Sequence, residues 1–232
     1  MVSRPKNPND DSLLRSIFDK TNLTNFSDAV IAIAITILVL DLKIEDIAPD
    51  NVDAMLSHAF FHIIPILTSF TIGFFVIAYY WYSYHRFMKH VNVIDTVFVL
   101  LNLFLLFLIV FLPFPTSILG SFLAKTSAVI LYSAVIAGIG LTTFLMRLYA
   151  WRLGKLIDTP DEKLLRSMTI QPLMSTIIYL ASIPVAFINP VVSIGMWLVA
   201  PVIYGVILRW IHRTHFRRHP AKESALIGIK EQ

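Results

Sequence analysis

Residues 26–45 read FSDAVIAIAITILVLDLKIE, and this stretch decides the class of fold. Asp28 stands at the start of an apolar run that continues to Leu40 and contains a single hydroxyl group, that of Thr36. Such a run is typical of a membrane-spanning helix. An ionisable side chain near the entrance of such a helix is costly unless it is paired. We therefore expect Phe26, Ser27 and Asp28 to belong to a polar network.

The rest of the chain is similarly apolar. It has 232 residues, of which 56% are hydrophobic and 15% are charged, and its mean hydropathy is +0.72. These values exclude an ordinary soluble domain and indicate an all-α, polytopic membrane protein. Six stretches are long enough to cross the hydrocarbon layer. They are residues 26–44, 59–83, 94–113, 127–148, 168–188 and 190–210.

The basic residues predict the orientation of these six spans. Of the 19 lysines and arginines, 17 fall in the amino-terminal segment, in the loops after the second and fourth spans, and in the carboxyl-terminal tail. Only Lys43 and Lys125 lie on the other side. By the positive-inside rule, both termini face the cytoplasm. We expect a cytoplasmic segment at 1–25, a six-helix transmembrane domain at 26–210 and a basic cytoplasmic tail at 211–232.

The excess of basic charge has a simple explanation. A sequence pI of about 9.3 could indicate nucleic-acid binding, but the basic residues follow the positive-inside pattern, and those of the tail suit anionic lipid headgroups. We therefore expect membrane lipids, and no nucleic acid, among the partners. The chain contains no cysteine, which excludes disulfides and thiolate metal sites.

The first span carries a continuous apolar stripe. At 100° per residue, five residues of this span fall on one face about 100° wide, while Ser27 and Asp28 lie well off it. An apolar face is available on any buried helix, so periodicity alone leaves two interpretations open, a pore lining and an ordinary packing face. The five residues of the stripe are Ala29, Ile33, Thr36, Ile37 and Leu40.

Phe26, Ser27 and Asp28 form the polar foot of this helix, and partners for it are available in the next two spans. Trp81 and His85 are four residues apart and therefore share a helix face near the cytoplasmic end of the second span. Both side chains could also serve as interfacial anchors. Asn102 lies between two leucines in the third span, which makes it the better candidate for a buried partner. An indole N–H, an imidazole and an amide can all bond a carboxylate or a hydroxyl.

These motifs resemble those of the transmembrane protein 175 family, potassium channels of bacteria and of endosomes and lysosomes that lack the usual selectivity-filter loop. The resemblance covers roughly residues 22–120. One departure is visible: the family usually has arginine four residues before the phenylalanine, where this chain has Asn22. The motifs are residues 26–41, His85-Arg86-Phe87, Asp95, Leu101-Asn102, residues 112–116 and Leu119-Gly120.

The resemblance implies a multi-pass channel of the cell membrane that assembles as a homotetramer with the first helix of each subunit around the axis. Ile33, Ile37 and Leu40 would then form hydrophobic rings, and Thr36 would add a ring of hydroxyl groups. Phe26, Ser27 and Asp28 would be braced by the three partner side chains from the second and third spans. Since no carbonyl filter sequence is present, we expect only weak selectivity for potassium over sodium.

A secondary transporter of a small ion or solute is the main alternative. Transporters usually carry ionisable or substrate-binding groups near the middle of the membrane, and the predicted spans have almost none there. An enzyme is not expected, because no nucleophile–base pair or glycine-rich phosphate loop is present. His58 and His62 have a spacing that can bind a metal, but they lack a third ligand, and we expect no metal and no cofactor.

Overall fold

A computed structural model describes residues 19–42, 52–122, 125–153, 157 and 162–197. Within these residues the regular elements are helices, and Val91 and Ile157 form an isolated antiparallel bridge. Five helices are long and apolar enough to cross a membrane. The predicted all-helical class is therefore confirmed. The five candidate spans are Lys20–Leu40, Ile63–Met88, Thr96–Ser121, Thr126–Arg152 and Leu164–Ile188.

The first span begins earlier than predicted. Helix α2 covers Lys20–Ile37, and the Asp19 side chain caps it by accepting a bond of 3.3 Å from the backbone N–H of Thr21. Asp at this position satisfies an otherwise unpaired amide of the first turn. The helix then tightens into the 3₁₀ turn η1, Leu38–Asp41. The predicted start at residue 26 marked the start of the apolar run and missed the polar first turn.

The second and third spans also extend beyond the predicted limits. Helix α3 runs over Val52–Met88, and helix α4 over Thr96–Phe111. Asp95 caps α4 by accepting a bond of 2.9 Å from the N–H of Phe98. Helix α5, Pro113–Ser121, follows directly and has proline at its first position, where the missing N–H costs little. The proline therefore starts a new helix and does not end the span.

The last described elements form a helical hairpin. Helix α6 covers Thr126–Leu148 and ends in the π-helical turn η3, Tyr149–Leu153. Helix α7 covers Glu162–Ile188. Residues 190–197 begin another helix after Asn189, whose side chain accepts a bond of 2.9 Å from the N–H of Val191. The predicted break between the fifth and sixth spans is present at Asn189, and the remainder of the predicted sixth span, 198–210, lies outside the described residues.

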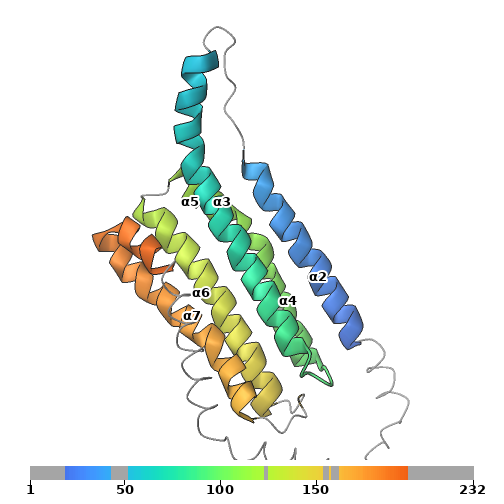
Figure 1. Ribbon diagram of the computed structural model, residues 1–232. Helices are drawn as coiled ribbons and strands as arrows, with labels where there is room; N and C mark the ends of the chain where they lie inside the picture. Colours follow the sequence, from blue (N-terminus) through green and yellow to red (C-terminus); the bar gives the residue numbers. More distant parts are fainter. Residues whose placement is uncertain (1–18, 43–51, 123–124, 154–156, 158–161, 198–232) are drawn as a thin grey trace, which may run out of the picture.

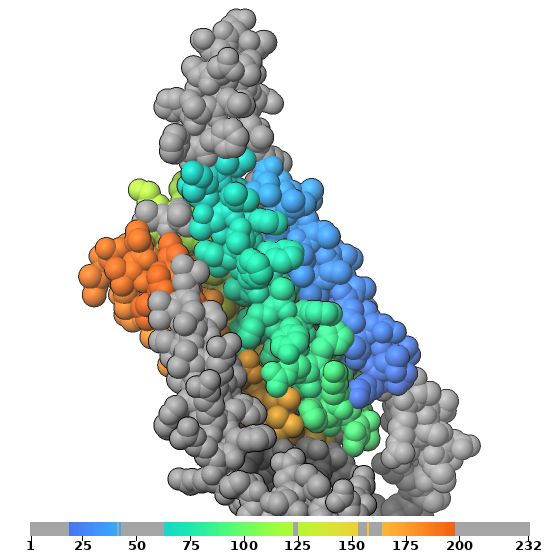
Figure 2. Space-filling model, in the orientation of Figure 1, coloured from blue at the N-terminus to red at the C-terminus, as the bar shows by residue number. Residues whose placement is uncertain are grey.

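The helices form a bundle with α2 at one side and α7 at the other (Figure 1). Helix α2 packs on α3 and α4, α4 packs on α6, and α6 makes its most extensive contact with α7. The core is filled by large apolar side chains of the central helices, among them Phe98, Ile109, Tyr132 and Ile136. In the space-filling view α2 forms one flank of the subunit (Figure 2). This position leaves one face of α2 without a partner among the residues that the structure describes.

Glycine allows two close helix contacts. A methyl group at Gly73 would lie 2.9 Å from Cγ2 of Thr116 in α5, and one at Gly140 would lie 2.5 Å from Oγ1 of Thr176 in α7. Small residues of this kind let helix backbones approach closely in membranes. Gly138 has more room, since its added methyl would meet Leu108 at 3.5 Å.

Candidate functional site

The exposed face of α2 coincides with the stripe derived from the sequence. All five stripe residues are exposed in the single subunit. Ile33 is 58% exposed, Ile37 38% and Leu40 64%. The opposite face is buried against α3 and α4 through Leu23, Ser27, Ile31 and Ala34. One side of the helix is thus fixed to its own subunit, and the other is free to meet something else.

The turn η1 straightens the end of this stripe. In a 3₁₀ helix, residues three apart lie in line, whereas in an α-helix they are offset by about 60°. Leu40 therefore lies directly above Ile37 along the helix axis. The 100° projection used for the sequence placed Leu40 near the centre of the stripe and Ile37 at one edge. The 3₁₀ turn moves Leu40 toward the edge that Ile37 occupies.

Thr36 presents its oxygen to the exposed face. Its hydroxyl group is exposed and donates a bond of 2.8 Å to the carbonyl of Ile33 in the same helix. A threonine hydroxyl has one hydrogen and two lone pairs. Since the hydrogen is used within the helix, the group faces outward as an acceptor, which is the polarity that a cation or the oxygen shell of a hydrated cation requires.

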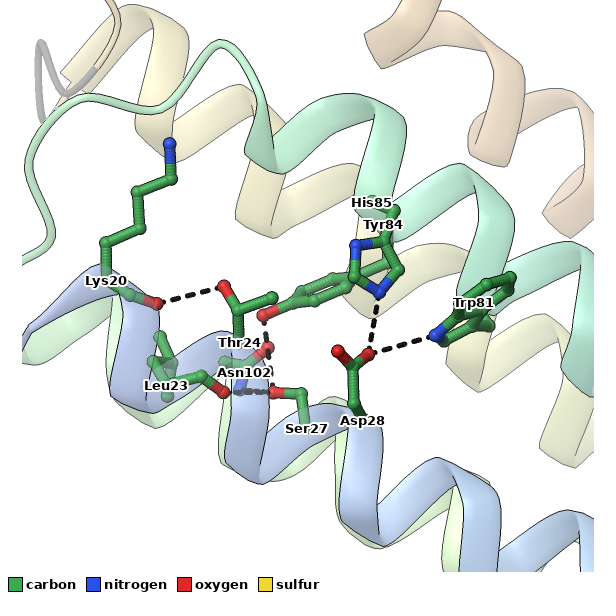
Figure 3. A network of polar contacts seen from close by, with 9 residues as sticks. All are labelled: Lys20, Leu23, Thr24, Ser27, Asp28, Trp81, Tyr84, His85 and Asn102. Atoms are coloured by element: carbon green, nitrogen blue, oxygen red, sulfur yellow. Dashed lines mark hydrogen bonds and ion pairs between the residues drawn. The ribbon is translucent and has the colours of Figure 1, made fainter.

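Asp28 is held by one helical turn of α3 (Figure 3). Its Oδ1 accepts a bond of 2.9 Å from Nε1 of Trp81 and lies 2.7 Å from Nε2 of His85. The rings of Trp81 and His85 pack edge to face, with centroids 4.8 Å apart. The side chains of Asp28 and His85 are 37% and 31% exposed. This carboxylate therefore keeps partial access to its surroundings while its position is fixed.

Ser27 is the buried centre of a second set of contacts. Its hydroxyl donates to the carbonyl of Leu23 at 2.8 Å, so its lone pairs are left to accept. Nδ2 of Asn102 donates to it at 2.9 Å, and the hydroxyl of Tyr84 lies 3.2 Å away. Ser27 and Asn102 have no exposed surface. These bonds tie α2 to α3 and α4 at one level.

Phe26 lies outside this network. Its side chain is 52% exposed and shares the outward face of α2 with Ala29 and Ile33. The structure thus brings together five of the six residues that the sequence assigned to the polar foot, namely Ser27, Asp28, Trp81, His85 and Asn102. The sixth faces away from them.

Two further polar residues were missed by sequence reasoning. Tyr84 bonds Ser27, and its position between Trp81 and His85 was the available signal. Arg147 falls within the predicted fourth span, 127–148, but was counted with the basic residues of the loop that follows; it lies in the last turn of α6 and is only 1% exposed. Among the residues that the structure describes, no group of three metal-binding side chains comes together.

Comparison with known proteins places this geometry in context. Residues 22–113 match the family described as "Endosomal/lysosomal potassium channel TMEM175". A potassium channel of Streptomyces collinus is 28% identical over 78% of this chain and 88% of its own length. A potassium channel of Chamaesiphon minutus is 29% identical over 78% of this chain and 91% of its own.

The fold agrees with these sequence relationships. The crystal structure of a lysosomal potassium-selective channel TMEM175 homologue from Chamaesiphon minutus superposes with a TM-score of 0.70. The two chains are 26% identical, and the alignment covers 81% of this chain and 96% of the homologue. The matched segment contains the α2 stripe and the contacts of Ser27 and Asp28. This chain is thus a multi-pass membrane protein that is similar to the TMEM175 family over residues 22–113 and to bacterial potassium channels over most of its length.

Proposed function

We propose that the chain is a subunit of a potassium-conducting channel of the cell membrane, with α2 of each subunit lining the pore. The observation that carries the proposal is the exposed stripe of α2, which stands beside a polar network that fixes the same helix. The bacterial relatives are potassium channels by name, which supports the same function. The proposal makes the protein a channel and not an enzyme.

The stripe has the chemistry of a hydrophobic constriction. Isoleucine and leucine side chains cannot coordinate an ion, so a narrow ring of them excludes water and blocks, whereas a wider ring passes a partly hydrated ion. In this proposal Ile33, Ile37 and Leu40 form three successive rings. Their exposure in the isolated subunit is what a helix that surrounds a shared axis requires.

Selectivity is assigned to Thr36. Because its hydroxyl hydrogen is bonded to the Ile33 carbonyl, a ring of these residues would present acceptor oxygens to a passing cation. Such a ring has fewer oxygens than a carbonyl cage, so we propose that it discriminates weakly between potassium and sodium. Potassium is favoured because it loses its hydration water more easily.

A pore lined by α2 requires several subunits, since one helix cannot enclose a channel. We propose a homotetramer, with both termini in the cytoplasm. In this arrangement the contacts of Asp28 with α3 lie at the cytoplasmic end of the pore. The assembled mass of the purified protein, measured by native mass spectrometry, tests the number of subunits.

The function is tested by recording current through the purified protein in a planar bilayer, first under a potassium gradient and then with potassium and sodium on opposite sides. Wild type is compared with Thr36→Ala. We expect a cation current whose reversal potential shifts in the variant. A current that is indifferent to Thr36 would remove this account of selectivity. Saturable uptake into liposomes without current would instead indicate a secondary transporter.

A further inference from the structure

Arg147 bridges three helices at a buried position. It lies in the last turn of α6, and its guanidinium donates to the carbonyl of Met168 in α7 at 2.6 Å. It also donates to the carbonyl of Ser83 in α3 at 2.9 Å and to the hydroxyl of the same serine at 2.8 Å. The guanidinium carbon lies 5.1 Å from the ring centroid of Phe87. A buried charge inside a membrane protein is expensive and commonly functional.

The geometry of this site suits arginine specifically. A guanidinium is planar and carries donors in a fixed fork, so it can bond carbonyls of two helices at once. The Ser83 carbonyl can accept from Arg147 through one lone pair while the other takes part in the helix of α3. Arg147 therefore holds α3 without breaking it.

The held segment is the turn of α3 that also holds α2. Ser83 precedes Tyr84, whose hydroxyl lies 3.2 Å from Ser27, and His85, which lies 2.7 Å from Asp28. Trp81, on the same turn, donates to Asp28. Residues 81–85 of α3 thus contact both α2 and Arg147. A shift of this stretch relative to α6 would carry the foot of α2 with it.

We propose that Arg147 is a positioning residue for the gate: it fixes the α3 turn that contacts Ser27 and Asp28, and through this turn it sets the position of the pore-lining stripe. The inference rests on the proposed function. The contacts described for Arg147 are with Met168, Ser83 and Phe87, none of which belongs to the stripe. Its effect is therefore on the balance between open and closed states and not on the choice of ion.

The test compares Arg147→Met, Arg147→Lys and Ser83→Ala with wild type in single-channel recordings. Residues along a coupled network change an equilibrium by a factor of about 2 to 30, and we expect the open-to-closed ratio of Arg147→Met to change within this range. Arg147→Lys keeps the charge and should lie nearer to wild type. Ser83→Ala removes the bond from Arg147 to the Ser83 hydroxyl and keeps the bonds to the two carbonyls, so it should shift the ratio in the same direction by a smaller factor.

Thr143→Val is the matched control. Thr143 is buried one turn before Arg147, and its hydroxyl bonds the Ile139 carbonyl within α6. This variant removes a hydrogen bond that is made within α6 and leaves the bonds from Arg147 to Ser83 in place, so its open-to-closed ratio should equal that of wild type. The reversal potential in mixed potassium and sodium should stay unchanged in all variants.

A second readout does not depend on current. Because the chain has no native cysteine, Thr36→Cys provides a single thiol on α2, whose rate of modification reports access to the stripe. We expect Arg147→Met to change this rate in the assembled protein, and Thr143→Val to leave it unchanged. If Arg147→Met does not assemble, Ser83→Ala carries the comparison.

The outcomes separate the two proposals. In a conducting wild type, an unchanged open-to-closed ratio together with an unchanged thiol rate in Arg147→Met, or in Ser83→Ala if Arg147→Met does not assemble, overturns the role of Arg147 and leaves the proposed channel standing. A shifted reversal potential with an unchanged ratio also overturns it, because it would mean that Arg147 acts on the ion directly. An absence of current in wild type overturns the channel, and the thiol rate then decides whether Arg147 still positions α2.

Discussion

At the scale of the residue, the contacts of Asp28 come from a single turn of α3. Trp81 and His85 both reach the same oxygen, Oδ1. Hydrogen bonds to a charged group are worth about 1.5–3 kcal/mol each, and the partial exposure of this pair reduces that value. The arrangement therefore fixes the foot of α2 with a moderate gain in free energy, and we assign it to assembly of the pore helix.

Asp28→Ala tests this assignment. Removing the carboxylate leaves the indole and imidazole donors of α3 without their acceptor, so we expect a lower thermal midpoint and less assembled protein in size-exclusion chromatography. Asp28→Asn keeps one acceptor oxygen and should fall between Asp28→Ala and wild type. A stable, conducting Asp28→Ala assembly with altered ion preference would show that Asp28 belongs to the permeation path instead.

The buried contact between Ser27 and Asn102 calls for a double-mutant cycle. In Ser27→Ala the amide of Asn102 loses its acceptor, and an unsatisfied buried polar group costs about 1–3 kcal/mol. Asn102→Leu removes the same bond from the other side. Because both variants break the same interaction, the double variant should lower the thermal midpoint by less than the sum of the two single effects. Fully additive effects would mean that the 2.9 Å contact contributes nothing.

Sequence reasoning succeeded at this scale where a polar residue stood in an apolar context. Ser27 and Asp28 stand at the start of an apolar run and Asn102 lies within one, and this contrast marked them as members of a polar network. Tyr84 carries no such contrast, because its ring is apolar and its hydroxyl finds Ser27 only through the packing of α2 on α3. Arg147 was misplaced because basic residues were taken to lie outside the membrane spans. Carbonyls from two other helices make its burial possible.

At the scale of the element, α6 contains a matched pair of glycines. A methyl group at Gly140 would meet Oγ1 of Thr176 at 2.5 Å and the backbone carbonyl of Pro172 at 3.1 Å, whereas one at Gly138 would meet only Leu108, at 3.5 Å or more. Overpacking of a close contact costs about 1–3 kcal/mol. The interface between α6 and α7 therefore depends on one glycine of the two.

Gly140→Ala should lower the thermal midpoint of the purified protein, because the α6 and α7 backbones must separate to admit the methyl group. Gly138→Ala serves as the control and should leave the midpoint unchanged or raise it, since alanine favours the helix. Equal effects of the two substitutions would contradict the close contact at Gly140.

Helix α2 supplies the second prediction at this scale. If its stripe forms the constriction, a polar side chain at Ile33 should hold water in the narrowest region and oppose dewetting. We therefore expect Ile33→Asn to carry more current than wild type at the same voltage in a planar bilayer. Ile35→Asn is the control, because Ile35 is half-buried and lies off the exposed stripe. An Ile33→Asn current no larger than that of wild type would place the constriction elsewhere.

The existence of the helices was predictable from apolar length, but their limits were not. The first turn of α2 is polar and is fixed by the Asp19 cap, and hydropathy does not register such a turn. The third span was predicted to end at residue 113, yet the chain continues into α5. The 3₁₀ turn at Leu38–Asp41 has no sequence signal that we recognise. It moves Leu40 by a local tightening of the backbone.

At the scale of the whole molecule, the described helices set Lys89 and Lys125 at opposite ends of the bundle. Lys89 follows the end of α3, and Lys125 precedes the start of α6. Since α4 with α5 crosses the bundle between them (Figure 1), one lysine faces each side of the membrane. The distribution of basic residues assigns the Lys89 end to the cytoplasm.

The absence of native cysteine makes this orientation directly measurable. Lys89→Cys and Lys125→Cys each introduce one thiol at an exposed position. A membrane-impermeant maleimide added to intact cells should label Lys125→Cys and leave Lys89→Cys unlabelled, and both should react after the membrane is permeabilised. The reverse labelling pattern would mean that the subunit has the opposite orientation in the membrane. The Asp28 contacts and Arg147 would then lie at the outer mouth of the proposed pore. The chain would also be an exception to the positive-inside rule, because the side that carries 17 of its 19 basic residues would face outward.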